Sequence, residues 1–312
     1  MPSASPEAAR APVLFLVFNR LDTTQRVFEA IRAAKPPRLY VAADGARSGK
    51  EGEAAQVKEV RDHITSQIDW PCEVKTLFRE ENLGCKLAVS GAISWFFEKE
   101  AEGIILEDDC LPAPDFFPFC ESLLARYRDD ASVAGISGDF KPVELGKGPD
   151  LFGTVGFPLI WGWASWRRAW QGYDRTLSEW TGDPASLPAL LHMPPGTQRY
   201  FSKEFDRTKA GELNTWDYQF TFLVLKNARR FLHPHVNLIS NLGFTGMATN
   251  TAAPDHPFAE LPLGKVRFPL NPEPVDAGYH DWLLRHVFNT DRLHQKVMRR
   301  LSRMARPKKS AS

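Results

Sequence analysis

Short apolar runs alternate with segments of helical periodicity through the first half of the 312-residue chain. Five runs have the length and composition of β-strands and lie at 12–18, 38–44, 73–78, 103–107 and 133–138. Segments with helical spacing lie at 22–34, 86–99 and 115–129, the first with Asp22 as its expected cap. This alternation predicts an α/β fold with a mostly parallel central sheet and helices on both faces.

The alternation stops near residue 150. Glycine, tryptophan and proline are frequent over 151–200, a helix is predicted around 216–229, and 229–240 is predicted to supply one further strand. The two halves of the chain are therefore expected to differ in organisation.

Charge is unevenly distributed along the chain. The formal net charge is +1, but residues 292–312 contain eight Lys or Arg and no acid, which leaves −7 for the rest. An acidic body argues against a surface that binds nucleic acid, and it is compatible with an enzyme that handles phosphates through a metal ion. Because no apolar run is long enough to span a bilayer and the start lacks signal-peptide order, we expect a soluble, cytoplasmic protein.

Three carboxylates, Glu107, Asp108 and Asp109, follow the fourth predicted strand. Ligands of open parallel sheets bind beyond the carboxyl ends of the strands. If the strand geometry persists through the triplet, alternation would direct Asp108 away from the other two acids. Clustered carboxylates raise one another's pKa unless a cation or hydrogen-bond donors compensate, so Mg²⁺ or Mn²⁺ is a natural partner. A second interpretation stays open, in which the acids are solvated and cap the next helix with Asp115 at its start.

The first half of the chain contains, in this order, the segments "LVFNRLDTTQRVFEAI", "AADGAR" and "REENLGCKLAVSGAI" and the acidic triplet. Together they resemble the nucleotide-sugar-binding half of GT-A glycosyltransferases. The second half of bacterial family-2-like nucleotide-diphospho-sugar transferases is similar to "WGWASWRRAW", "NTWDYQF" and "NLISNLGFTGMATNT". The resemblance implies a GT-A, Rossmann-like fold with an acceptor-side region. Its expected parts are a disordered N-terminus (1–11), a nucleotide-sugar-binding half (12–140), an acceptor and catalytic half of the same domain (141–291) and a basic amphipathic tail (292–312).

The resemblance implies a role for each matching residue of the donor half. Asp109 matches the residue that binds the divalent metal, while Asp108 and Glu107 match residues that reach the ribose or support the metal site. Asp44 matches an acid that accepts a hydrogen bond from the nucleobase. The remaining donor-binding candidates are Asn19 and Arg20 beside the base and Asn82, Gly84 and Lys86 in the NLG turn. Each also has an ordinary structural interpretation as a turn, helix-entry or solvent-facing residue.

Asp217, between Trp216 and Tyr218 near the start of a predicted helix, is the candidate general base. Apolar neighbours raise the pKa of a carboxylate, and an inverting transfer needs one carboxylate to take the proton from the acceptor hydroxyl. A first-turn acid that interacts favourably with the helix dipole is the structural alternative.

Large aromatic residues near this motif admit two uses, because they stack on sugar rings or fill a core. The candidates for the acceptor site are Trp161, Trp163 and Trp216. Trp166 and Trp170 are expected in the core instead.

Related sequences tend to place a His near the end of "GFTGMATNT", where it adds a metal ligand, and here that position is Asn250. An amide oxygen still coordinates a hard cation, although more weakly than imidazole does for Mn²⁺. The metal candidates are therefore Asp109 and Asn250, with His233, His235 and His256 as alternative ligands.

The resemblance therefore implies a metal-dependent glycosyltransferase, a hexosyl- or N-acetylhexosaminyltransferase of bacterial polysaccharide biosynthesis. It would move a sugar from a nucleotide-diphosphate donor, UDP-sugar by default, to a glycan or lipid-linked acceptor, with inversion through Asp217. A GT-like module that binds a nucleotide sugar or glycan without turnover stays open. A sugar-phosphate nucleotidyltransferase is disfavoured, because the first strand leads into "NRLDTTQR" and not into a glycine-rich, basic loop.

The C-terminal tail has the pattern of a basic amphipathic helix. Leu293, Val297, Leu301 and Met304 recur at helical spacing, and arginines occupy the other faces. Such a helix either lies on an anionic membrane, as peripheral contact at the inner face of the cell membrane, or packs its apolar stripe on the acidic body.

Overall fold

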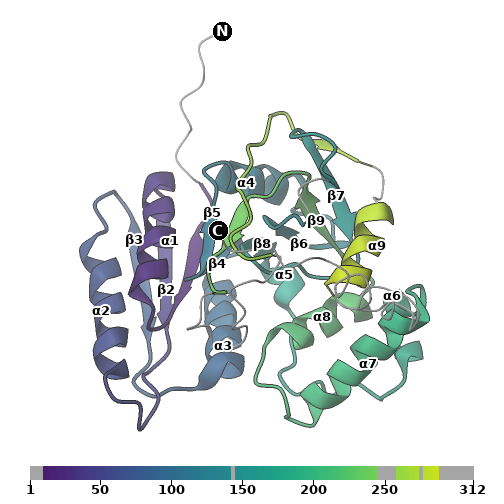
Figure 1. Cartoon of the computed structure of the whole chain (residues 1–312), viewed down its shortest axis with the longest axis horizontal. Coiled ribbons are helices and arrows are strands. Elements are labelled where there is room, and N and C mark those ends of the chain that lie inside the picture. The colour runs from purple at the N-terminus through teal and green to yellow at the C-terminus, as the bar shows by residue number, and fades with distance from the viewer. Residues whose placement is uncertain (1–9, 142–144, 245–257, 274–276, 288–312) are drawn as a thin grey trace, which may run out of the picture.

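A nine-stranded sheet organises the chain, with the strand order β11-β7-β9-β6-β8-β4-β1-β2-β3 (Figure 1). The computed structural model describes residues 10–141, 145–244, 258–273 and 277–287. The parallel part of the sheet, β4-β1-β2-β3, consists of β1 (Val13–Val17), β2 (Arg38–Ala43), β3 (Glu73–Phe78) and β4 (Glu102–Glu107). The helices between these strands are α1 (Leu21–Ala34), α2 (Glu53–Ser66) and α3 (Gly84–Lys99).

The second half of the chain completes the same sheet. This half contributes the strands β6 (Val133–Ser137), β7 (Leu151–Val155), β8 (Trp163–Trp166), β9 (Arg230–Pro234) and β11 (Asn271–Pro272) to the main sheet. β8 is antiparallel to both β4 and β6, and β9 is parallel to β6 and antiparallel to β7. A separate two-stranded sheet pairs β5 (Cys110–Pro112) with β10 (Ile239–Asn241).

Helices cover both faces of the main sheet, which confirms the predicted α/β class. Side chains of α1, α2 and α4 (Phe116–Arg126) share one core cluster. The other cluster contains side chains of α3 and of the later helices, which are α5 (Arg167–Trp170), α6 (Pro188–Leu191), α7 (Pro195–Lys209), α8 (Asp217–Lys226) and α9 (Ala277–His286). A short 3₁₀ turn, Pro184–Ser186, precedes α6. In Figure 1, α1 and α2 lie on the left of the view, beside β1 to β3, and α6 to α9 lie on the right.

Strand β1 shows why an inner parallel strand is apolar throughout, in contrast to the edge strand β3, which has no fully buried residue. Leu14 and Leu16 enter one core cluster, whereas Val13, Phe15 and Val17 enter the other. A strand buried on both faces reads as a continuous hydrophobic run, and this is what made the strands of the first half recognisable in the sequence.

Some expectations about individual elements are wrong. Helix α2 was not predicted, and the tryptophan-rich segment supplies a central strand, β8. The segment 229–240, predicted as one strand, contributes to two strands in different sheets, β9 and β10. β9 ends at Pro234, because proline has no amide hydrogen to donate to a neighbouring strand. Arg20, not Asp22, precedes α1 as its N-cap residue, so Asp22 lies in the first turn. Asp115 does precede α4, although its side chain makes no capping hydrogen bond.

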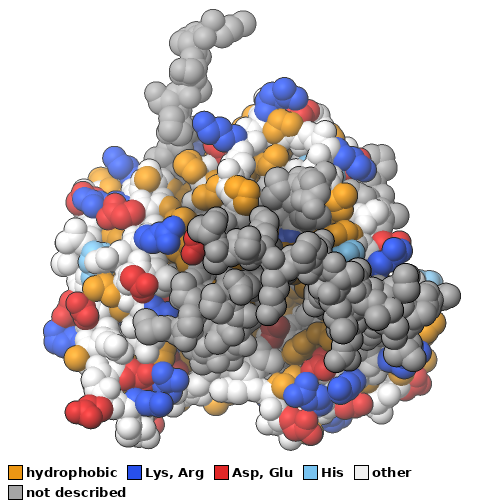
Figure 2. All heavy atoms as spheres, viewed as in Figure 1, with side chains coloured by type: hydrophobic (Ala, Val, Ile, Leu, Met, Phe, Trp, Pro, Cys, Tyr) orange, Lys and Arg blue, Asp and Glu red, His pale blue; other side chains and the backbone are white. Residues whose placement is uncertain are grey.

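The predicted basic tail, 292–312, lies outside the described residues, and so do residues 1–9 of the predicted disordered N-terminus. Residues 10 and 11 are described, and their amides donate to Glu121 Oε1 at 2.6 and 3.1 Å. Within the part that is described, no helix has both the length and the apolar character needed to cross a membrane. Figure 2 shows basic and acidic side chains interspersed on one face, so neither sign of charge dominates the described residues visible there.

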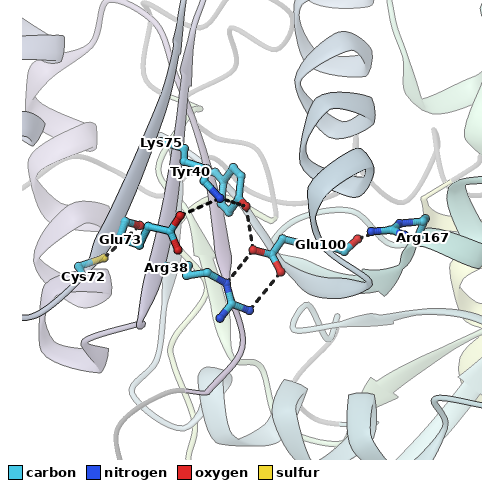
Figure 3. Close-up of polar contacts among 7 residues, drawn as sticks. All are labelled: Arg38, Tyr40, Cys72, Glu73, Lys75, Glu100 and Arg167. Atoms are coloured by element: carbon cyan, nitrogen blue, oxygen red, sulfur yellow. Dashed lines mark hydrogen bonds and ion pairs between the residues drawn. The ribbon is translucent and has the colours of Figure 1, made fainter.

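An ion-pair network holds the amino-terminal end of β2 to the end of α3, away from the carboxyl ends of the strands (Figure 3). Glu100 is 8% exposed. It accepts hydrogen bonds from Arg38 Nε and Nη2 at 2.7 and 3.1 Å and from the Tyr40 hydroxyl at 2.8 Å. The Lys75 ammonium in turn donates to the Tyr40 oxygen at 3.2 Å. Glu100 therefore connects two elements through three charge-assisted bonds.

We expect Glu100→Ala to lower the free energy of unfolding by about 2 kcal/mol, because it removes the partner of a guanidinium and of a buried hydroxyl at once. Urea denaturation monitored by circular dichroism measures the change. The matched control is Glu98→Ala, since Glu98 is an exposed acid of the same helix and its loss should be nearly neutral. Equal losses in the two variants would contradict a stabilising role for this network.

Candidate active site

A cleft of about 840 Å³ opens at the carboxyl ends of β1, β2 and β4. Its other wall comes from the second half of the chain, namely α7, residues 213–218 and residues 241–244. Predicted site residues that line the cleft are Asn19, Arg20, Asp44, Asn82, Gly84, Glu107, Asp108, Asp109, Trp161, Trp216 and Asp217. The fold therefore brings candidates from both halves to one cavity, as expected for ligand sites in open parallel sheets.

The condition for strand alternation of the acidic triplet is not met. β4 ends at Glu107, and Asp108 and Asp109 lie in the turn that follows, so all three acids line the cleft. Arg20, at the end of β1, binds both aspartates: its Nη2 pairs with Asp108 Oδ1 and lies 3.0 Å from Asp109 Oδ2. One compensating cation is thus present in the chain itself, and Asp108 and Asp109 are ion-paired with it, not merely solvated.

The three acids and Arg20 shift one another's pKa values. Burial, reinforced by Asp109 and Asp108, raises the pKa of Glu107 to about 8. Burial also raises the pKa of Asp108 to about 6, although Arg20 opposes the rise. Burial lowers the pKa of the Arg20 guanidinium, but the two aspartates outweigh that effect and raise it. The site therefore holds more negative charge than one guanidinium neutralises.

The oxygens of this site suit a hard divalent ion. The Asp109 side chain is 18% exposed at the cleft, and the buried Oδ2 atom of Asp108 has no hydrogen-bond partner among the described residues. Across those residues, however, no three His, Cys, Asp or Glu side chains are grouped to hold a metal. Carboxylate oxygens are the ligands that Mg²⁺ and Mn²⁺ prefer, so an ion here would complete its shell with substrate oxygens or with other residues. Asn250 and His256 lie outside the described part of the chain.

Asp44 connects the end of β2 to the beginning of α3. Its carboxylate accepts hydrogen bonds from the amides of Leu83 and Gly84 at 3.0–3.1 Å. Gly84 has φ of +75°, a conformation that glycine adopts without strain. Asn82 Nδ2 donates to the Gly45 carbonyl at 2.7 Å. These contacts give Asp44 and Asn82 definite structural roles in the turn, while both side chains still border the cleft.

Asp217 is the first residue of α8 and projects from the opposite wall. Burial raises the pKa of its carboxylate, whereas the Thr215 hydroxyl and nearby backbone amides lower it. The Thr215 hydroxyl donates directly to Asp217 Oδ1. A carboxylate with a raised pKa that faces a cleft has the properties of a general base.

Three of the tryptophans occupy different environments. Trp161 lines the cleft, with the Lys141 ammonium 3.4 Å from its ring centroid and the Phe244 ring 5.5 Å away. Trp216 also lines it, although it is 3% exposed. The assignment of Trp163 to the acceptor site is wrong, because this side chain is 1% exposed and stacks on Trp216 inside the core. Trp166 and Trp170 are buried, as predicted.

Two further candidate groups do not face the cleft. Lys86 is absent from its lining, and only its backbone amide is engaged there, donating to Asn214 Oδ1 at 3.2 Å. His233 and His235 are fully buried, and both pack against Phe140. They are therefore not placed to replace a metal ligand at Asp109.

The cleft also contains residues that the sequence did not indicate. They are Arg47, Arg79, Glu204, Arg207, Asn214, Thr215, Asn241 and Gly243. Arg47 pairs with Glu53, whose carboxylate also accepts from Asn19 at 3.0 Å. Gly243 leaves room for the Asp109 carboxylate, since a Cβ atom at position 243 would lie 2.2 Å from Asp109 Oδ2. Six of these residues lie within the motifs that resemble GT-A enzymes, which was the available signal for them, whereas Glu204 and Arg207 lie in none.

Fold and site together define an α/β protein with an acidic cleft at the carboxyl ends of its parallel strands. No protein-family model and no curated protein matches the chain.

Solved structures with some likeness include HddC from Yersinia pseudotuberculosis, at 12% identity and a TM-score of 0.28, over 47% of this chain and 60% of that chain. Another is UDP-glucose pyrophosphorylase complexed with UDP-glucose, at 11% identity and a TM-score of 0.35, over 72% of this chain and 90% of that chain. A third is the apo form of mouse xyloside xylosyltransferase 1, at 11% identity and a TM-score of 0.32, over 69% of this chain and 81% of that chain. Likenesses with TM-scores this low do not define an activity.

Proposed function

We propose that this protein is a glycosyltransferase that moves a sugar from a nucleotide-diphosphate donor to a glycan or lipid-linked acceptor, with inversion. UDP is the default nucleotide. The observation that carries the proposal is the single cleft in which the acidic turn after β4 faces Asp217 of α8. One wall can hold an anionic donor through a divalent cation bound to its carboxylates, and the other offers a base for the acceptor.

Different residues of the chain would have different roles in such a transfer. Asp217 takes the proton of the acceptor hydroxyl as that oxygen attacks the anomeric carbon. Trp161, fixed from behind by Lys141, offers an aromatic surface for a sugar ring. Asn19, Asp44 and the start of α3 border the region for the nucleoside.

Asp109 would hold Mn²⁺ or Mg²⁺, with Asn250 as a further candidate ligand. When bound, such an ion stabilises the negative charge of a departing nucleoside diphosphate. Arg20, already paired with both aspartates, neutralises part of the negative charge of this site.

A thermal-shift screen of nucleoside diphosphates with and without Mn²⁺ tests the donor class. A ligand that binds only the folded state stabilises it by mass action, by about 2.7 kcal/mol at a hundred times its Kd. We expect one nucleotide to raise the melting temperature in the presence of Mn²⁺. No stabilisation by any nucleotide would contradict a nucleotide-sugar site.

The Arg20 ion pairs favour a second candidate, a module that binds a nucleotide sugar without turnover, because they satisfy the acids without an ion. Hydrolysis of a UDP-sugar panel in Mn²⁺ separates the two functions. A glycosyltransferase releases UDP slowly in water, and a binding module shows a thermal shift without release.

A further inference from the structure

The segment that carries Asp217 is held to the rest of the fold at several points. Asn214 Oδ1 accepts a hydrogen bond from the backbone amide of Lys86 in α3, at 3.2 Å. The Trp216 carbonyl accepts from the Tyr173 hydroxyl at 3.0 Å, and the Trp216 ring stacks on Trp163 with 5.9 Å between the centroids. The backbone that presents Asp217 is therefore held at several points.

Thr215 adds a contact to the reactive group itself. It lies two residues before Asp217, lines the same cleft, and donates its hydroxyl hydrogen to Asp217 Oδ1. Because Trp216 between them is 3% exposed and packed, the two side chains are fixed relative to each other. A carboxylate bound in this way keeps one orientation, which a general base needs in order to meet an acceptor hydroxyl.

We propose that Thr215 is a positioning residue for Asp217, and that its hydroxyl orients the carboxylate for proton transfer from the acceptor. This inference rests on the proposed function, in which Asp217 is the base. Thr215 touches neither donor nor acceptor in this role; it acts through Asp217.

The electrostatic surroundings of Asp217 predict how the loss of that hydroxyl would appear. The charge of Asp217 raises the pKa of a titratable group on each neighbouring element. These groups are Cys85 of α3, Glu107 of β4, Tyr173 after α5, Tyr200 of α7 and Tyr218 of α8. Glu107 is the carboxylate among them, and the charge of Asp217 raises the pKa of Glu107. A hydrogen bond to an ionised carboxylate favours the ionised form, and its removal therefore raises the pKa of Asp217.

The experiment compares Thr215→Val, which keeps the shape and removes the hydroxyl, with Thr215→Ser, which keeps the hydroxyl. The pKa of Asp217 is followed by ¹³C NMR of aspartate-labelled protein, with Asp217→Asn identifying the resonance. We expect Thr215→Val to raise this pKa by about one pH unit, since a hydrogen bond to a charged group is worth about 1.5 kcal/mol. The acid limb of the pH profile for transfer moves up equally, kcat falls about tenfold, and donor KM stays within about twofold. Thr215→Ser retains the wild-type behaviour.

Thr176→Val is the matched control. Thr176 Oγ1 donates to Asp174 Oδ1 at 2.7 Å, so this variant breaks the same kind of pair outside the cleft lining. It should leave the Asp217 pKa and the pH profile unchanged. An unshifted pKa in Thr215→Val, or equal effects in Thr215→Val and Thr215→Ser, would overturn the role of Thr215. The NMR titration of Asp217 does not depend on catalytic turnover, so it tests the role of Thr215 by itself. The proposed function is contradicted by a different result, namely that the wild-type protein releases no nucleotide from any donor.

Discussion

Asp217→Asn is expected to lower sugar transfer on the order of a hundredfold or more while nucleotide-sugar binding persists. The substitution keeps the shape of the side chain and removes its ability to accept a proton. Asparagine can also still accept the hydroxyl hydrogen bond of Thr215, so the local structure at the start of α8 should survive. The donor wall, formed by β1, β2 and β4, is not touched by the change.

Single-turnover transfer rates and donor affinity, measured on the same preparations, check this prediction. The matched control is Asp62→Asn, because Asp62 is an acid 60% exposed on the surface of α2 and its loss should not affect transfer. A variant that transfers sugar at nearly the wild-type rate would show that the base lies elsewhere or that the configuration is retained by another route.

The sequence predicted the strands of the first half well because the inner ones are apolar on both faces. Val13 to Val17 form a continuous hydrophobic run, and Asp44 and Glu107 mark the points where buried strands meet the cleft. In parallel sheets those points lie on one edge, so the positions of the acids along the chain were enough to bring them together. The physical basis of the prediction is therefore local, since it needs only strand ends and connecting helices.

The second half was predicted less well, because its structure depends on contacts between distant segments. β8 is four residues long, and its pairing with β4 and β6 is what makes Trp163 a core residue. Spacing alone does not distinguish that tryptophan from Trp161, which borders the cleft two residues earlier. The pairing of Arg20 with two aspartates nearly ninety positions later is likewise a product of the fold.

Asp109→Ala is expected to abolish metal-dependent nucleotide-sugar binding and to leave the fold intact. The residue lies in the turn after β4 and not in the core, and Arg20 keeps Asp108 as its partner when the Asp109 carboxylate is removed. Calorimetric titration of the nucleotide at several Mn²⁺ concentrations measures the loss. Wild-type affinity in this variant, with the same dependence on Mn²⁺, would assign the metal to other residues.

Gly243→Ala tests the same carboxylate without removing it. An added Cβ would lie 2.2 Å from Asp109 Oδ2, and the carboxylate, as the end of a side chain, can rotate away from it. We expect binding to weaken in this variant by a large part of the Asp109→Ala loss, and the double variant to be no weaker than Asp109→Ala, because both changes act on one group. Gly148→Ala is the control, since a Cβ there would make only ordinary contacts, 3.4 Å or more from its neighbours. Fully additive losses in the double variant would mean that Gly243 acts on binding independently of Asp109.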